Sequence, residues 1–384
     1  MEPYEAGLMK TIEMNIEDKI AKLMKGFKSV LYEEDEHFLE CMKSRNLAGD
    51  DVHHYMFWEW TQGVGLYGFY MLYEQTGEKR YLKLLEDYYQ RCFKIGLPAR
   101  NVNTCAPMLT LALFANKTSN SKYLSVCRQW ADWYLEDMPR TEEGGFQHIT
   151  SDSLNDGELW DDTLFMTVLF LAVMGGITGD KRYSEEAIFQ VLIHQKYLAD
   201  KKTGLWYHGW TYNGRHNFAE AFWGRGNCWI TAFIPLFLEY CDLPDSICKY
   251  LVSILKAQCD ALVKYQDDES GLWHTLIDDD SSYLEVSASC GFGFGMLRSC
   301  HDGLLPDNYK DVALKALDSV LENITEDGVV TKVSYGTPMG RNSKDFYKEI
   351  PYRSMPYGTA LALLFLIEAQ KEYISIDKKK ILSM

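Results

Sequence analysis

The feature that most limits how this chain can fold is a short phrase that recurs along it. Residues 72–82 read LYEQTGEKRYL, residues 175–183 read GGITGDKRY, and residues 115–124 are a looser copy, ANKTSNSKYL. Each copy follows an apolar stretch and precedes a second stretch with apolar residues at helical spacing. The Gly or Asn in the turn suits a helix end with positive φ, and the Asp or Ser that follows can cap the next helix. Each copy therefore predicts a helical hairpin.

A second phrase marks the other ends of the hairpins. It reads EGGFQH at 143–148, TGLWYH at 203–208, SGLWH at 270–274 and EDGVV at 326–330. A short extended segment follows each time, and then an inner helix rich in small and apolar residues. The inner helices expected are 58–74, 104–114, 162–173, 226–240, 287–299 and 355–369. Outer helices such as 79–93 and 311–323 are amphipathic, so only one side of them is buried.

This alternation predicts an all-α fold, a closed double ring of six inner and six outer helices known as the (α/α)6 toroid. An open solenoid is the alternative architecture, but neither end of the chain carries the polar capping repeat that a solenoid needs. We expect one catalytic domain over residues 1–384, with a polar tail at 374–384. Closure would gather the longer loops at one face, so polar residues there are the candidates for chemistry.

Charge and cysteine content narrow the function classes. The net charge of −16 provides no basic field for phosphate neutralisation, so we expect no nucleic-acid partner. The ten cysteines are scattered without CxxC spacing, which favours reduced thiols and a cytoplasmic location. The first residues lack a signal-peptide pattern, and no apolar run is long enough to span a membrane. We expect a protein without a membrane partner, as a monomer or a weak homo-oligomer.

The aromatic content is high, with ten Trp and 25 Tyr. Aromatic rings can stack on the apolar faces of sugars, although an aromatic-rich core would give the same composition.

The strongest chemical candidate is the acidic cluster ELWDDT at 158–163, which leads directly into an apolar helix. Asp161, Asp162 and Thr163 would lie at its N-terminus, and a helix cap explains one such residue. Two adjacent carboxylates exceed what a cap needs. Proximity of like charges beside Trp160 could raise the pKa of one carboxyl into the range of a general acid.

Other rim segments carry binding candidates. His148, His208 and His274 occupy the same place in three repeats and suit either a metal or a sugar. Arg225 stands between two glycines, which suits binding of a carboxylate; a structural ion pair with a rim acid such as Asp161 or Glu220 is the alternative.

Three further segments occupy corresponding rim positions. They are WEW at 58–60, NVN at 101–103 and YLEVS at 283–287, and their polar residues are candidates for substrate contact. Glu285 could equally cap the helix that follows it.

Four motifs in the same order resemble those of one enzyme family. They are WDDTLFM at 160–166, TGLWYHGW at 203–210, WGRGNCW at 223–229, and SGLWH at 270–274 with YLEVSAS at 283–289. Over about residues 55–369 the chain resembles glycoside hydrolase family 105, the unsaturated rhamnogalacturonyl hydrolases, which are related to the unsaturated glucuronyl hydrolases of family 88.

The resemblance implies a specific reaction without cofactor or metal. Such enzymes remove an unsaturated galacturonyl residue, with a C4=C5 double bond, from the non-reducing end of rhamnogalacturonan fragments left by lyases. An acid protonates C4 of the vinyl ether and water adds at C5.

The same resemblance assigns roles to residues. Asp162 maps to the catalytic position, and Asp161 is its neighbour. His208, Trp223 and Arg225 map to positions that hold the sugar and its carboxylate, with Trp229 in the same motif and His148 less directly matched. Asn103 stands where many relatives carry a second Asp, which puts a two-carboxylate mechanism and the substrate preference in question.

The sequence also allows three other functions. The enzyme could act on an unsaturated glucuronyl unit of another polysaccharide. It could be a hydrolase or epimerase of saturated sugars on the same fold, with Glu285 or Glu59 as the second carboxylate. It could also be a helical-repeat module that binds carbohydrate or protein without catalysis.

Overall fold

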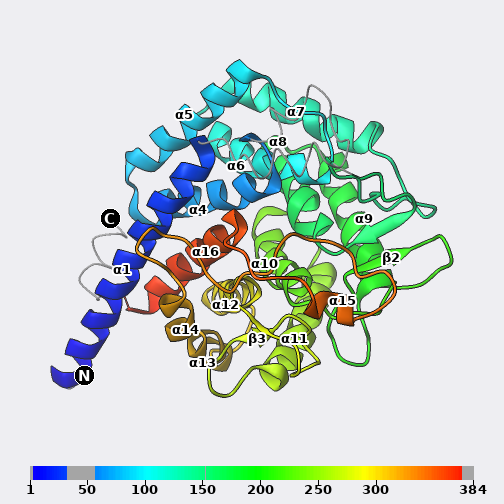
Figure 1. Cartoon of the computed structure of the whole chain (residues 1–384). Coiled ribbons are helices and arrows are strands. Elements are labelled where there is room, and N and C mark those ends of the chain that lie inside the picture. Colours follow the sequence, from blue (N-terminus) through cyan, green and yellow to red (C-terminus); the bar gives the residue numbers. More distant parts are fainter. Residues whose placement is uncertain (1–2, 33–56, 152, 374–384) are drawn as a thin grey trace.

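The computed structural model describes residues 3–32, 57–151 and 153–373, so the expected tail at 374–384 lies outside the described residues. Within these ranges the chain forms a closed double ring of helices (Figure 1). The inner ring runs through α4 (Trp60–Thr76), α6 (Val102–Lys117), η2 (Leu164–Val168) with α8 (Leu169–Thr178), α10 (Gly224–Tyr240), α12 (Val286–His301) and α16 (Pro356–Tyr373). Helix α16 packs against α4, and this contact closes the ring. The toroid is confirmed and the open solenoid is wrong.

The outer ring lies around these helices. It consists of α1 (Pro3–Tyr32), α5 (Lys79–Ile95), α7 (Ser121–Glu136), α9 (Lys181–Leu198), α11 (Asp245–Tyr265) and the pair α13 (Asn308–Lys315) and α14 (Leu317–Glu322). The expected outer helix at 311–323 is thus two helices that meet at Ala316. In the described part of the chain, no helix is long and apolar enough to cross a membrane.

The hairpin turns follow the sequence phrase in two of its three copies. Gly77 and Gly179 end α4 and α8 with φ of 70° and 69°, as the phrase predicts. In the looser copy the positive φ falls on Ser119, at 54°, while Asn120 caps α7 by accepting a hydrogen bond from the backbone of Tyr123. The prediction of a positive φ at Gly or Asn is therefore wrong for this turn, because Asn120 is used as the cap of the next helix.

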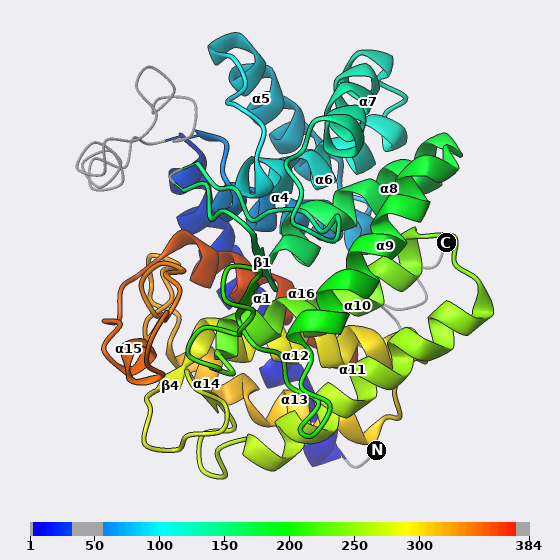
Figure 2. The same ribbon diagram turned by 90° about the vertical axis from the view of Figure 1, so that its right-hand side faces the viewer.

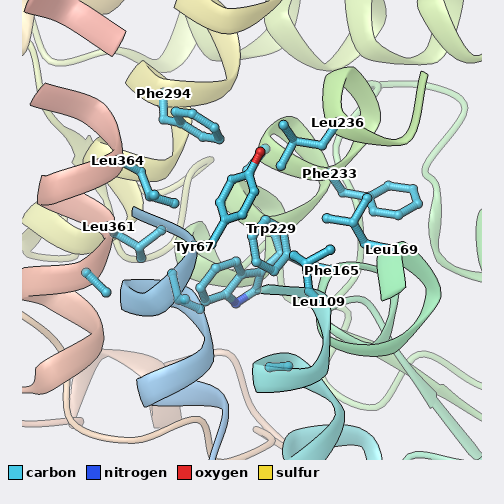
Figure 3. Packing of buried hydrophobic residues seen from close by; sticks show 14 of the residues in the cluster. Tyr67, Leu109, Phe165, Leu169, Trp229, Phe233, Leu236, Phe294, Leu361 and Leu364 are labelled. Carbon is cyan, nitrogen blue, oxygen red and sulfur yellow. The ribbon is translucent and has the colours of Figure 1, made fainter. Parts of the chain in front are cut away.

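The centre of the ring is filled by apolar side chains from the inner helices. Figure 3 shows them pointing toward one another: Tyr67, Leu109, Phe165, Leu169, Trp229, Phe233, Leu236, Phe294, Leu361 and Leu364. Their burial explains why the inner helices are apolar on nearly every side, since each faces both the outer ring and this centre. A polar ligand therefore has to bind at an end of the ring.

One end carries two short strand pairs. Strand β1 (Glu158–Trp160) pairs antiparallel with β2 (Gly209–Thr211), so that Trp160 lies opposite Gly209. Strand β3 (Trp273–His274) pairs with β4 (Leu284–Glu285). Figure 2 shows β1 and β4 at the same end of the toroid as α15 (Asp345–Lys348). We call this end the mouth of the ring, and it is where the sequence motifs meet.

Candidate active site

The acidic pair lies where β1 passes into the inner ring. The backbone N–H of Asp161 donates to the carbonyl of His208 over 3.1 Å, which ties the pair to the neighbouring strand segment. Both carboxyl oxygens of Asp161 and Oδ1 of Asp162 are buried and have no hydrogen-bond partner in the described part of the chain. The helix that follows begins as the π-helix η2, and Thr163 at its start makes no side-chain capping bond. The pair therefore does not act as a conventional helix cap, and π-turns of this kind are frequent at functional sites.

Burial alters the acidity of both carboxyls. It raises the pKa of Asp161 well above its usual value, and the adjacent Asp162 raises it further. Burial also raises the pKa of Asp162 to about 7, although nearby backbone N–H groups and the charge of Arg225 act in the opposite direction. The sequence suggested repulsion between the two charges as the cause, but desolvation is the main cause for each. Asp162 can thus hold a proton near neutral pH.

The two carboxyls differ in accessibility. Asp161 is fully buried and packs against the first turn of α10, where a Cβ at Gly226 would lie only 2.3 Å from Asp161 Oδ2. A glycine is therefore required at 226. Asp162 retains 6% of its exposure, so it is the member of the pair that a ligand can reach.

His148 lies flat against Trp160. The two rings stack with centroids 4.3 Å apart and an interplanar angle of 7°. Nδ1 of His148 hydrogen-bonds the hydroxyl of Thr163 over 2.9 Å and lies 3.4 Å from Asp162 Oδ1. Burial lowers the pKa of His148 to about 3, so this ring is neutral beside the acid.

His208 is the second histidine in contact with Trp160. Its ring meets the Trp160 ring edge-on at 5.1 Å and the Trp223 ring at 4.4 Å. Nδ1 of His208 hydrogen-bonds the hydroxyl of Tyr347 over 2.7 Å, whereas Nε2 is buried and finds no partner among the residues that the structure describes.

The third rim histidine does not join the other two. Nδ1 of His274 hydrogen-bonds the carbonyl of Ser282 within its own hairpin. Among the described residues, no three or more His, Cys, Asp or Glu side chains are grouped as metal ligands. The structure therefore does not gather the three histidines around one metal.

Arg225 is fully buried between two aromatic rings, with its guanidinium 4.6 Å from the Trp223 ring and 4.5 Å from the Tyr357 ring. Its terminal nitrogens donate to Ser287, to Ser334 and to the carbonyl of Gly336, while Nε has no partner within the described ranges.

The carboxylate nearest to Arg225 is that of Glu285, at 3.5 Å. The alternative of a structural ion pair with a rim acid is therefore confirmed, but its partner is Glu285 and not Asp161 or Glu220. Glu285 also caps α12 by accepting from the backbone of Ala288 and from the Ser287 hydroxyl. Its interpretation as a cap is confirmed.

The remaining candidates lie lower or farther out. Trp229 is fully buried, edge-on to Trp60 at 6.0 Å and close to Phe165, so it belongs to the apolar centre beneath the site. Asn103 is partly exposed in the first turn of α6, next to the capping residue Asn101. Glu59 caps α4. The roles of Trp229 and Asn103 in substrate binding stay predictions.

One group of site residues was not predicted from the sequence. The segment between α14 and α16 supplies Ser334 and Gly336, which hold Arg225, and Tyr347, which holds His208. Its only signal was the stretch SYGTPMG at 334–340, because glycine, proline and an aromatic residue in a long connection mark a functional loop.

Comparison with solved structures defines the class of the protein. The chain matches the crystal structure of a possible member of glycoside hydrolase family 105 from Salmonella enterica serovar Paratyphi A, at 44% identity and a TM-score of 0.86, over 94% of this chain and 95% of that one. A possible member of the same family from Klebsiella pneumoniae matches at 41% identity and a TM-score of 0.85, over 97% and 95% of the two chains. These similarities and the site define a toroidal glycoside hydrolase.

The family follows from the sequence match. Residues 37–373 match Glycosyl Hydrolase Family 88, and the chain belongs to this family. It is also 33% identical over 317 residues to the unsaturated rhamnogalacturonyl hydrolase YesR of Bacillus subtilis, covering 82% of this chain and 90% of that protein. The resemblance read from the four motifs is confirmed, and the reading as a non-catalytic module is wrong.

Proposed function

We propose that this enzyme removes the unsaturated galacturonyl residue from the non-reducing end of rhamnogalacturonan oligosaccharides produced by lyases. The observation that carries the proposal is Asp162, a carboxyl whose pKa of about 7 lets it carry a proton, with Oδ1 unpartnered at the mouth of the ring. The similarity to an unsaturated rhamnogalacturonyl hydrolase supports the choice of substrate.

The proposed reaction uses Asp162 twice. Its proton passes to C4 of the vinyl ether, which leaves a positive charge shared by C5 and the ring oxygen. Water then bonds to C5, and the Asp162 carboxylate accepts the proton that the water loses. The bond between C5 and the ring oxygen breaks, and the hemiacetal formed at C1 releases the rest of the oligosaccharide as an alcohol. The sum consumes one water and needs no redox partner.

The neighbours of Asp162 suit an anionic substrate. Burial keeps the pKa of Asp161 well above its usual value and that of His148 at about 3. Burial thus favours the neutral form of both groups, which reduces repulsion of a substrate carboxylate. Arg225 supplies a positive charge near Asp162, and its Nε remains without a protein partner. The rings of Trp160 and Trp223 are buried against His148 and His208, so they orient these two histidines. A direct role of Trp223 in holding the sugar stays a prediction.

The alternative on saturated sugars loses its support. It needs a second carboxylate for the water or the covalent intermediate. Glu285 is engaged by Arg225 and by the start of α12, and Glu59 caps α4. A different unsaturated uronyl unit would use the same chemistry and differ only in the remainder of the oligosaccharide.

The location and partners belong to the same proposal. The scattered cysteines favour a cytoplasmic enzyme that acts on short oligosaccharides, as a monomer or weak homo-oligomer. The charge of −16 disfavours a nucleic-acid partner.

The test replaces Asp162 with Asn and follows the ultraviolet absorbance of the conjugated C4=C5 bond in an unsaturated rhamnogalacturonyl disaccharide. A carboxamide cannot donate the proton, so we expect kcat to fall about 10²- to 10⁴-fold. Asp156→Asn is the matched control, because Asp156 is exposed on the turn just before β1. Full activity of Asp162→Asn would refute the assignment of Asp162 as the proton donor. A wild type that acts on a saturated disaccharide and not on the unsaturated one would refute the substrate class.

A further inference from the structure

We propose that Tyr347 is a positioning residue that fixes His208 with its proton on Nε2, so that His208 serves as a hydrogen-bond donor to the substrate. The tautomer follows from the protein alone, whereas the nature of the acceptor rests on the proposed function. Tyr347 lies outside the sequence motifs.

Tyr347 reaches the site from the connection between α14 and α16. In Figure 1 this orange segment crosses in front of the inner ring and brings α15 close to β2. The Tyr347 side chain is fully buried, with its ring 5.8 Å from that of His208 and 5.8 Å from that of Trp223. A Cβ at Gly340 would lie 2.4 Å from the Tyr347 ring, so a glycine at 340 makes room for it.

The hydroxyl of Tyr347 has three neighbours but only one proton. It accepts a hydrogen bond from the backbone N–H of Gly340 over 3.0 Å, lies 2.7 Å from His208 Nδ1, and lies 3.6 Å from the sulfur of Met339. The N–H of Gly340 can only donate. The phenolic proton therefore goes either to His208 Nδ1 or to the Met339 sulfur.

The choice between these two arrangements decides the tautomer. If the hydroxyl donates to Nδ1, the proton of the neutral imidazole must be on Nε2. If it donates to Met339, the imidazole proton is on Nδ1 and Nε2 is a bare acceptor. A thioether is a weak acceptor and an imidazole nitrogen is a strong one, so the short bond to Nδ1 is the better use of the proton. The geometry points to Nε2–H.

Burial keeps this arrangement stable against pH. It lowers the pKa of His208 well below its usual value and raises the pKa of Tyr347 above its own. Both groups therefore stay neutral around pH 7, and the ring keeps one donor and one acceptor nitrogen.

The consequence concerns what the site can bind. The His208 ring contacts both Trp160 and Trp223, and its Nε2 is buried without a partner among the described residues, so this nitrogen is available to a bound ligand. A donor there suits an oxygen that has no proton to give, such as the uronyl carboxylate or the ring oxygen. Tyr347 would thus favour an acidic sugar through the tautomer that it imposes on His208.

The first experiment measures the tautomer directly in the full chain without ligand. Long-range proton–nitrogen NMR spectra of protein labelled with ¹⁵N-histidine distinguish Nε2–H from Nδ1–H, and the His208→Gln variant identifies the His208 signals. We expect the Nε2–H pattern in the wild type and in Tyr352→Phe, whose lost hydroxyl bonds only the carbonyl of Leu284. An Nδ1–H pattern for His208 in the wild type would overturn the proposal, whether or not Tyr347→Phe folds.

The second experiment removes the hydroxyl with Tyr347→Phe. We expect the His208 signals to move toward Nδ1–H or a mixture, and kcat/KM on the unsaturated disaccharide to fall about 10-fold. In the His208→Gln background, where the amide N–H₂ replaces Nε2–H, the same change should alter kcat/KM by less than about twofold, as for residues that act through one another. An unchanged tautomer in Tyr347→Phe, or equal losses in both backgrounds, would contradict the positioning role.

The outcomes separate this proposal from the proposed function. An Nε2–H tautomer that responds to Tyr347→Phe, in an enzyme inactive on unsaturated uronyl disaccharides, would support the positioning of His208 and refute the substrate. Full activity on the unsaturated disaccharide with His208 as the Nδ1–H tautomer would support the proposed function and refute the positioning role of Tyr347.

Discussion

Two inner helices of the ring begin with acidic residues, but these residues have different roles at the two helix starts. After β1, the chain enters η2 and α8 through Asp161 and Asp162; after β4, it enters α12 through Glu285. In both places a short strand at the mouth leads to acidic residues at a helix start. The sequence alone allowed either place to be a cap or a catalyst.

The two helix starts differ in the hydrogen bonds that their carboxyl oxygens accept. The Glu285 carboxylate accepts hydrogen bonds from the backbone of Ala288 and Ser334 and lies 3.5 Å from Arg225. At the other helix start, Asp161 accepts none with either carboxyl oxygen and Asp162 Oδ1 is also unpartnered. A buried acid with full hydrogen bonding is stable as an anion, whereas a buried acid without it keeps its proton. Partners, more than position in the repeat, separate a structural acid from a proton donor.

The largest effect that would test this comparison is on stability at the Glu285 end. Glu285→Gln leaves the buried Arg225 without its nearest carboxylate, so we expect the free energy of unfolding to fall by about 3–5 kcal/mol. Urea unfolding followed by fluorescence measures it. A variant with unchanged stability and lost turnover would make Glu285 a chemical group and would restore the saturated-sugar alternative.

Asp162→Asn should change stability in the opposite direction from Glu285→Gln: it should raise the free energy of unfolding, and only above acidic pH. The pKa of Asp162 in the folded protein, about 7, exceeds the usual value of 3.8. Its contribution to the free energy of unfolding is therefore fully present below pH 3.8 and is lost as the pH rises through 7. This pKa difference corresponds to at most about 4 kcal/mol. Asp162→Asn does not titrate and should therefore be more stable than the wild type at pH 8.

Thermal unfolding at pH 4 and pH 8 checks this expectation. The gain of Asp162→Asn over the wild type should be present at pH 8 and small at pH 4, with Asp156→Asn showing no such trend. An equal difference at both values would mean that Asp162 titrates normally in the folded protein.

The smallest effect should come from Asp161→Asn. Because burial raises the pKa of Asp161 and so favours its neutral form, an amide of the same size should change little in the field around Asp162. We expect kcat to change less than about 10-fold, below what loss of a general acid costs, and the pH dependence of kcat to keep its midpoint. A shift of that midpoint toward acid would show that Asp161 carries a charge that holds the Asp162 proton.

These contrasts also show what the sequence could predict. The recurring phrases predicted the hairpins and the toroid, because helix period and turn chemistry are local properties. The WDDT motif placed the acids at the mouth. The partners of Arg225 and His208 could not be foreseen, because Ser334 and Tyr347 come from an irregular connection more than 100 residues away along the chain. The cap that Glu285 forms is local, but its contacts with Ser334 and Arg225 depend on tertiary packing.

The central claim is that burial keeps a proton on Asp162 near neutral pH. Its most direct test is a ¹³C NMR titration of the aspartate carboxyls in the free enzyme, with the Asp162 signal identified by its absence in Asp162→Asn. We predict a midpoint near the pKa of about 7. A midpoint near the ordinary value of 3.8 would leave Asp162 ionised at working pH and contradict its role as the proton donor.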